Sequence, residues 1–446
     1  MTGPVRWLRK LGLLALAAVC AGAMTSAPVP ASAAGGGAAP KPIMGWSSWS
    51  NFRGGITESI VVAQARAMHS TLQSHGYTYV NVDSGWTNRE DGFGRKLWNT
   101  TKFPSGIPAL ASQLHSMGLK LGIYLTPGIN RTDVASNVPI FGTNFHAQDF
   151  ADTTTTGNTA GSTTWRIDLS KPGSHEYIQS LADLYASWNV DYIKMNFVGP
   201  GGGRVPADNR TEIQAWHQAI LSTGRPIVLE LSNSLSFANA STWQQFANGW
   251  RIDGDIECYR CEVKPSHFPL TSWAKVSLRF ADLPRWTPFA GPGGWNDLDS
   301  LEVGAGANDG LTAAQRRSAV TLWSIASAPL ILGPDLTHLD AADLALITND
   351  EVIAVDQAGV PASPLAPGGT QQVWRSKQPD GTFVVALFNL STTATATVRV
   401  TWSQLGFNRP ASVRDLWSHK DLGTRATGFS ASVGPGATRL LRVTPA

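Results

Sequence analysis

The sequence predicts an α/β fold: a (β/α)8 TIM barrel over residues 42–355, followed by a small C-terminal antiparallel β-sandwich domain over residues 356–446. Three observations lead to this prediction. Short apolar runs alternate with longer amphipathic stretches through the first region, which is typical of a parallel sheet with helical crossovers. No Gly-rich phosphate loop follows the first strand, which favours a closed barrel over an open doubly wound sheet. From about Asp356 the pattern changes to short alternating runs separated by turn residues.

The individual elements follow from periodicity. In the barrel region, the apolar runs that we expect to form strands are Tyr79–Val82, Leu119–Tyr124, Val190–Met195, Ile227–Leu231 and Trp250–Ile252. Helical patterns lie at Glu58–Leu72, Ser174–Trp188, Arg210–Leu221 and Ala313–Ala326. In the second region, the expected strands are Gln371–Arg375, Thr382–Asn389, Ala394–Thr401, Ser412–Leu416 and Thr438–Val443.

The N-terminal segment has the pattern of an export signal. Basic residues precede the apolar run Leu11–Ala23, and the small residues Ala31–Ala33 provide a cleavage site. The run is too short to span a bilayer core of ~30 Å. We therefore expect residues 1–33 to be a signal peptide, residues 34–41 to be a flexible mature N-terminus, and the protein to be secreted to the extracellular space without a membrane anchor.

Composition and cysteine spacing narrow the function classes. The 35 basic and 32 acidic residues are interspersed, so no nucleic-acid partner is expected. The 17 Trp residues suit either an ordinary core or flat faces for sugar rings. After signal cleavage two cysteines remain, Cys258 and Cys261, and His267 alone cannot complete a zinc site, so we expect a local disulfide. The His residues form no metal-binding pair at a strand end, and we expect neither a metal nor a cofactor.

Polar side chains and Trp follow the predicted strands at the point where each strand ends. In a barrel of this type the carboxyl ends of all strands meet at one rim, which is where active sites lie. Residues two apart on a strand share a face. Lys194 and Asn196 are therefore expected on one face of their strand, and Glu230 and Ser232 on one face of theirs. The sequence therefore predicts an active or binding site at this rim, with candidates Trp49, Asp83, Ser84, Tyr124, Lys194, Asn196, Glu230, Ser232, Arg251, Asp255, Trp295 and Asp297.

Several segments, in this order along nearly the whole mature chain, resemble the melibiase-type α-galactosidase family of glycoside hydrolases. They are Met44–Trp49, Val82–Trp86, Phe103–Gly106, Gly118–Tyr124, Asp191–Lys194, Gly291–Asp297 and Ala328–Leu330. The family also contains isomalto-dextranases and β-L-arabinopyranosidases, so the resemblance implies an oligo- or polysaccharide substrate without fixing the sugar.

The resemblance also implies roles for individual residues. Asp255 matches the acid/base and Arg251 a ligand of sugar hydroxyls. Lys194, Asp83 and Asp297 match substrate-binding positions. Trp49 matches the aromatic platform, and Tyr124 matches a tyrosine that lines the pocket.

Three positions depart from the family pattern. Asn196 stands where the family has its nucleophilic Asp, and an amide has no anionic oxygen to attack an anomeric carbon. Ser84 replaces the second Asp of a pair that recognises galactose. Leu231-Ser232-Asn233 replaces a segment that contacts the 2-position of the sugar.

Four hypotheses account for Asn196. The protein can be an inverting hydrolase in which Asp255 is the acid and Glu230, or else Asp83, is the base, although Glu230 could equally form a salt bridge to Lys194 or Arg251. It can be a catalytically inactive sugar-binding relative, an engineered Asp-to-Asn variant of a retaining enzyme, or an enzyme whose substrate supplies the nucleophile. We favour an active glycosidase, because a pure binding protein has no need for Asp255 or for a cation at Lys194 that stabilises a nearby anion.

Overall fold

The computed structural model describes residues 1, 3, 37–161 and 163–446. The predicted signal peptide, apart from residues 1 and 3, lies outside these ranges. Eight parallel strands form the first sheet, in the order β12-β11-β10-β9-β5-β2-β1-β13. They are β1 (Met44–Ser47), β2 (Tyr79–Val82), β5 (Lys120–Leu125), β9 (Tyr192–Met195), β10 (Val228–Leu231), β11 (Gly249–Arg251), β12 (Trp295–Asp297) and β13 (Leu330–Leu332). A parallel bridge between Leu301 and Leu332 links the two ends of this order, as expected for the predicted barrel.

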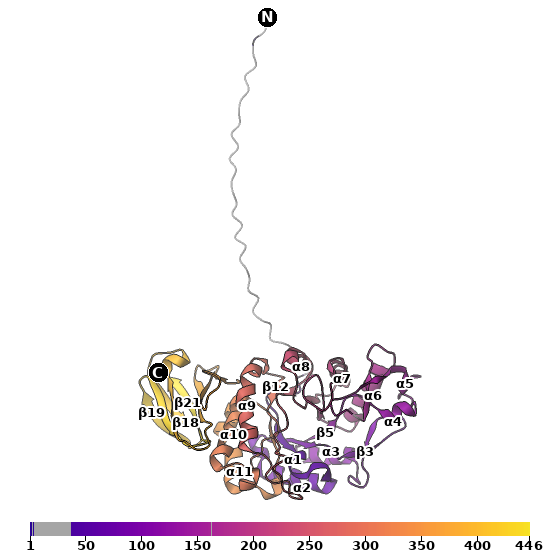
Figure 1. The fold of residues 1–446 in the computed structure, drawn as a ribbon, viewed down its shortest axis with the longest axis horizontal. Coiled ribbons are helices and arrows are strands. Elements are labelled where there is room, and N and C mark those ends of the chain that lie inside the picture. The colour runs from indigo at the N-terminus through magenta and orange to yellow at the C-terminus, as the bar shows by residue number, and fades with distance from the viewer. Residues whose placement is uncertain (2, 4–36, 162) are drawn as a thin grey trace. The chain divides into compact units, whose positions relative to one another are not determined.

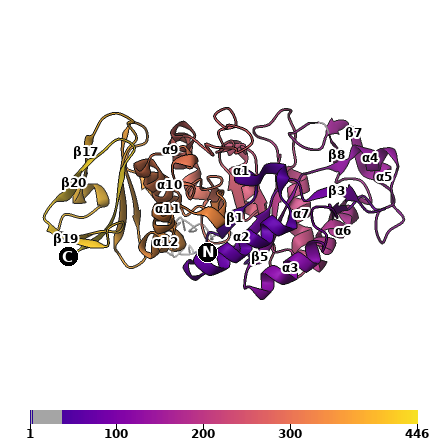
Figure 2. The ribbon, with the colours of Figure 1, turned by 90° about the horizontal axis from the view of Figure 1, so that it is seen from below.

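Helices cover the outside of this sheet (Figures 1 and 2). The long ones are α2 (Glu58–Thr71), α3 (Ile107–Ser116), α6 (Ser174–Ser187), α7 (Arg210–Ser222), α9 (Trp273–Trp286) and α10 (Ala313–Ala326). The shorter ones are α1 (Trp49–Phe52), α4 (Arg131–Ala135), α5 (Ala147–Phe150), α8 (Ala240–Phe246), α11 (Ala341–Ile347) and α12 (Asp350–Gln357). Among the described residues, no helix is both long and apolar enough to cross a membrane.

Side-chain caps fix where several helices begin. The Thr57 hydroxyl accepts a hydrogen bond from the backbone of Ile60 at the start of α2, and Thr312 and Gln315 form a capping box at the start of α10. Such caps satisfy backbone N–H groups that have no partner within the helix. The four predicted helices, which correspond to α2, α6, α7 and α10, begin and end within one residue of their expected bounds.

Two short β-sheet insertions follow strands of the barrel at the rim. The strands β3 (Thr87–Glu90) and β4 (Lys96–Trp98) follow β2. A three-stranded sheet of β6 (Ile129–Asn130), β7 (Ala151–Thr156) and β8 (Thr164–Ile167) follows β5. Neither insertion was predicted, because their polar, half-exposed strands lack the apolar runs of the barrel.

The C-terminal region is the predicted antiparallel β-sandwich. One sheet has the order β14-β15-β16-β21-β18-β19, and the pair β17-β20 covers it. Val385, Val400 and Leu441 lie in the apolar core between the two layers. The strands are β14 (Ser363–Pro364), β15 (Gln371–Lys377), β16 (Phe383–Asn389), β17 (Ala396–Thr401), β18 (Ala411–Asp415), β19 (Lys420–Arg425), β20 (Gly428–Val433) and β21 (Thr438–Pro445), with the short helix α13 (Trp402–Leu405) after β17.

The sandwich packs on the barrel beside α9 and α10 (Figure 2). The rings of Phe280 and Phe388 lie 4.8 Å apart across this interface, and the Ser318 hydroxyl donates to the carbonyl of Gly436 at 2.8 Å. The domain boundary predicted between residues 355 and 356 falls inside α12, and the first strand of the sandwich begins at Ser363.

Within the predicted flexible tail over residues 34–41, the structure describes residues 37–41, and they are anchored to the barrel at Ala39. Ala39 is buried, and its carbonyl oxygen accepts hydrogen bonds from the Trp295 indole at 3.0 Å and from the Gly293 backbone at 2.9 Å. The described end of this segment is therefore fixed beneath the barrel, because it supplies the acceptor that the buried indole requires.

Candidate active site

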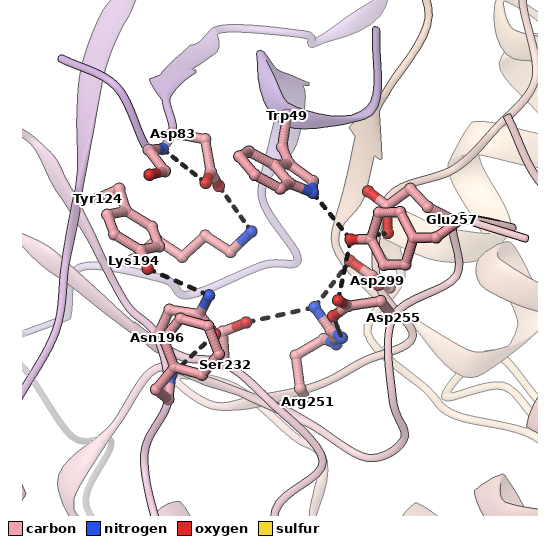
Figure 3. A pocket seen from close by; sticks show the side chains of 13 residues that line it. Trp49, Asp83, Tyr124, Lys194, Asn196, Ser232, Arg251, Asp255, Glu257 and Asp299 are labelled. Atoms are coloured by element: carbon pink, nitrogen blue, oxygen red, sulfur yellow. Dashed lines mark hydrogen bonds and ion pairs between the residues drawn. The ribbon is translucent and has the colours of Figure 1, made fainter. Parts of the chain in front are cut away.

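A pocket with a volume of about 130 Å³ lies at the C-terminal ends of the barrel strands (Figure 3). Strands β2, β5, β9, β10 and β11 each contribute residues within two positions of their last residue, and α1 contributes its first residue. Nine of the predicted site residues line this pocket: Trp49, Asp83, Ser84, Tyr124, Lys194, Asn196, Ser232, Arg251 and Asp255. The sequence argument about strand ends therefore located the pocket correctly.

Lys194 and Asp83 form a buried ion pair on one side of the pocket (Figure 3). The Lys194 ammonium lies 2.8 Å from Asp83 Oδ2, while Asp83 Oδ1 accepts from the backbone N–H of Ser84 at 2.7 Å. Burial alone would lower the pKa of Lys194, but the carboxylates of Asp83 and Asp299 outweigh it and raise the pKa above its ordinary value. The pocket therefore holds a permanent cation next to Asn196.

Asn196 presents an amide to the pocket at the end of β9. Its Oδ1 accepts from the backbone N–H of Phe197 at 2.8 Å, and its Nδ2 lies 3.5 Å from the hydroxyl of Tyr124. Burial, with the nearby Asp83 carboxylate, raises the pKa of Tyr124, which keeps the phenol neutral. Neither Asn196 nor Tyr124 therefore offers an anionic oxygen at this side of the pocket.

Arg251 binds two carboxylates on the opposite side of the pocket (Figure 3). Its Nη2 lies 2.7 Å from Asp255 Oδ1 and its Nη1 lies 2.9 Å from Asp299 Oδ1. Burial tends to raise the pKa of Asp255, but the Arg251 guanidinium and a hydrogen bond from Tyr259 lower it to about 2. Asp255 is thus held as a carboxylate in this structure.

Glu257 and Tyr259, which the sequence argument did not identify, also line the pocket, as do Phe197 and Asp299. Tyr259 lies between Cys258 and Cys261, which form the predicted disulfide. Both residues belong to an irregular loop after β11, where no periodicity indicates which side chains point inward. The only available signal was their position four residues or fewer after Asp255.

Asp255, Glu257 and Asp299 place carboxylate oxygens within 4.8 Å of one another, close enough to hold a metal ion. Arg251 already supplies a positive charge to two of the three. Burial, together with the carboxylates of Asp299 and Asp255, raises the pKa of Glu257 to about 7. The Arg251 guanidinium therefore offsets part of the negative charge of this cluster.

Glu257→Gln is expected to change how stability depends on pH. The pKa of Glu257 in the folded protein, about 7, lies above its unfolded value of about 4.3. Its stabilising contribution is therefore complete below about pH 4 and is lost as the pH rises through 7. The free energy of unfolding of the variant, relative to wild type, should increase by about 3 kcal/mol between pH 4 and pH 8. Urea titrations at several pH values measure this difference, and a constant difference would contradict it.

Glu230, Asp297 and Trp295 do not line the pocket, contrary to the prediction. A strand rises ~3.3 Å per residue, so Glu230 lies about two residues deeper in the barrel than Ser232. It lines a second small cavity with Asp297, which borders the pocket at Lys194 and Asp299, and Gly249 on the neighbouring strand leaves room for the Glu230 carboxyl group. Trp295, deeper still at the start of β12, packs at the other end of the barrel.

The environment of Glu230 does not suit a base that activates water in the pocket. Burial and the adjacent Asp297 carboxyl raise its pKa well above the ordinary value, which favours a neutral acid. Its Oε1 is buried without a hydrogen-bond partner. The alternative that Glu230 forms a salt bridge to Lys194 or Arg251 is not observed either, since those cations pair with Asp83, Asp255 and Asp299.

Carboxylates, a lysine and an arginine at the rim of a (β/α)8 barrel that carries a β-sandwich domain are typical of a glycoside hydrolase. The chain belongs to the melibiase-type α-galactosidase family. Residues 41–156 and 161–358 match the family model described as alpha galactosidase A, and residues 368–443 match the alpha galactosidase C-terminal beta sandwich domain.

Two relatives and one further structure illustrate the range of this family. The α-galactosidase of Cyamopsis tetragonoloba is 33% identical over 91% of this chain and 86% of its own length. The structure of a β-L-arabinopyranosidase from Geobacillus stearothermophilus superposes with a TM-score of 0.84 at 31% identity, covering 92% of this chain and 97% of that one. α-Galactosidase I from Mortierella vinacea superposes with a TM-score of 0.71 at 28% identity, covering 92% and 99%.

Proposed function

We propose that this protein hydrolyses a terminal glycoside by direct attack of water, with Asp255 as the general acid and no covalent intermediate. The observation that carries the proposal is the position of Asn196, whose amide lies at the end of β9, two residues after Lys194. In the family pattern this position holds the nucleophile. An amide cannot take that role, whereas water activated by a carboxylate on the far side of the sugar can.

Asp83 is the base that we propose. It lies with Lys194 on the side of the pocket away from Asp255 (Figure 3). Inverting glycosidases separate their two carboxyl groups by ~6.5–9.5 Å so that a water molecule fits beside the sugar. Glu230 is no longer preferred for this role, because it lies in a separate cavity with a raised pKa.

For the substrate we propose an α-D-galactoside or a β-L-arabinopyranoside. The Cyamopsis and Geobacillus relatives are named for these two activities. The two sugars share the configuration of the ring, and the arabinoside lacks the hydroxymethyl group at C5. Ser84 in the pocket wall has a short neutral hydroxyl, whereas the family pattern has a second carboxylate there that binds galactose hydroxyls. This difference supports testing both sugars.

We also propose that the protein is exported. The basic residues and apolar run before Ala33 support this, and the disulfide between Cys258 and Cys261 suits an oxidising compartment.

A second candidate function is sugar binding without turnover. The amide at Asn196 and the ionised state of Asp255 both favour it. A panel of nitrophenyl α-galactosides, α-glucosides and arabinosides separates the two functions when hydrolysis and calorimetric binding are measured side by side. Release of nitrophenol, with inversion at the anomeric carbon, supports hydrolysis by water. Binding of a sugar without release of product from any member supports the binding function.

A further inference from the structure

Tyr259 stands at the tip of a loop that is fixed from both ends. The disulfide joins the residues on either side of its turn, and the Cys258 carbonyl accepts hydrogen bonds from the backbones of Cys261 at 2.7 Å and Glu262 at 3.1 Å. The backbone of Cys258 in turn donates to Leu270 at 2.9 Å. The tyrosine is 42% exposed, yet its backbone has little freedom.

The hydrogen bonds of the Tyr259 hydroxyl have a defined direction. The Trp49 indole N–H can only donate, and it lies 2.9 Å from the Tyr259 oxygen. The single hydroxyl proton is therefore free to go to Asp255 Oδ2, which lies 2.9 Å away, in preference to Glu257 Oε2 at 3.5 Å. Trp49, 210 residues away in the chain, thus orients the donor toward Asp255.

Arg53 holds the two rings in this arrangement. Its guanidinium carbon lies 5.1 Å from the centre of the Tyr259 ring and 5.6 Å from that of Trp49. It also pairs with Glu262 at 2.8 Å and donates to the Trp49 carbonyl at 2.9 Å. The cation–π contacts and the ion pair of Arg53 together fix the position of the Tyr259 ring at the rim of the pocket.

Both oxygens of Asp255 are consequently occupied by donors, Oδ1 by Arg251 and Oδ2 by Tyr259. A general acid must instead carry a proton on an oxygen that faces the leaving-group oxygen. We infer that Tyr259 is a positioning residue that holds Oδ2 of the ionised Asp255 until a glycoside enters. Asp255 then takes up one proton from solvent and donates it in a hydrogen bond from Oδ2 to the leaving-group oxygen, while the Tyr259 hydroxyl turns to Glu257 Oε2. This inference rests on the proposed role of Asp255 as the acid.

Charged groups from several elements surround Asp255. Arg251 on β11 and Lys194 on β9 are cations that face it, and Asp299 and Glu257 are the acidic neighbours. Lys275 on α9 donates to the backbone carbonyl of Asp255 at 2.7 Å. Tyr259 is neutral, so losing its hydroxyl removes a donor to the carboxylate while leaving the net charge unaltered. Loss of the Tyr259 hydroxyl therefore favours the protonated form of Asp255.

The test is a 13C NMR titration of protein labelled at the aspartate carboxyl carbons, with the Asp255 signal assigned by its absence in Asp255→Asn. In Tyr259→Phe, we expect the midpoint of Asp255 to rise by about one pH unit relative to wild type. Tyr79→Phe is the matched control. The Tyr79 hydroxyl accepts from Lys120 at the opposite end of the barrel, so its loss should leave the midpoint unchanged. An unchanged midpoint in Tyr259→Phe overturns the inference.

A second arm adds the nitrophenyl glycoside that the panel selects, made with a carbon in place of the ring oxygen so that it keeps the leaving-group oxygen but cannot be hydrolysed, or the free sugar as its control. In wild type, the glycoside should raise the Asp255 midpoint and the free sugar should not. In Tyr259→Phe, the glycoside should raise the Asp255 midpoint only slightly further. A wild-type midpoint that the glycoside does not raise overturns the inference. Because the first arm needs no turnover, it still reports on Tyr259 if the panel shows no hydrolysis, so failure of the proposed function and failure of this inference are distinguishable.

Discussion

Replacing Asp255 by Asn is expected to lower kcat/KM by about 10³-fold for a disaccharide with a sugar leaving group, because proton donation contributes ~10²–10⁴-fold. The loss should be much smaller for a nitrophenyl glycoside, whose leaving group needs little protonation. Kinetics of both substrates, with calorimetry of sugar binding, measure this difference. Binding should persist, since Arg251, Lys194 and Trp49 remain in the pocket.

The control for this prediction is Asp208→Asn, a change of the same type at an exposed ion pair with Arg210 outside the pocket. It should leave both rates within a few-fold of wild type. An equal, small loss for both substrates in Asp255→Asn would mean that another group protonates the leaving oxygen.

Replacing Asn196 by Asp is expected to change the stereochemistry of the reaction from inversion to predominant retention. The new carboxylate would lie beside the Lys194 cation, which stabilises an anion there, and would be available to attack the anomeric carbon. Proton NMR of the first-formed sugar measures the outcome, and mass spectrometry detects a covalent glycosyl-enzyme.

Asn196→Ala is the matched control, because it removes the amide without adding a nucleophile. The product of Asn196→Ala should stay inverted. Continued inversion in Asn196→Asp would show that this strand end does not face the anomeric carbon as proposed.

The sequence located the rim of the barrel but not the depth of each side chain along its strand. Asp83, Lys194 and Asp255 were correctly predicted to lie at the pocket, since each ends or follows an apolar run. A period of two residues predicts which face of a strand a side chain lies on. It does not predict how deep in the barrel, along the strand, that side chain lies. For this reason Glu230 and Asp297, which are on the correct face, were placed one layer too high.

Tyr259 could not have been predicted by such reasoning. Its role depends on hydrogen bonds to Trp49 and Asp255 and on a loop conformation fixed by the disulfide. The fixed position of Ala39 likewise depends on the Trp295 indole, which is distant in the chain. Both are tertiary contacts of residues outside any periodic element, where local patterns carry little information.

The anomeric configuration of the first product tests the central claim most directly. Wild-type protein is mixed with the best glycoside of the panel, and proton NMR spectra are collected before the released sugar equilibrates. Attack by water opposite the departing group predicts that the first sugar has the anomeric configuration opposite to that of the substrate. A first product that retains the configuration of the substrate would contradict the account, because retention requires a nucleophile that Asn196 cannot provide.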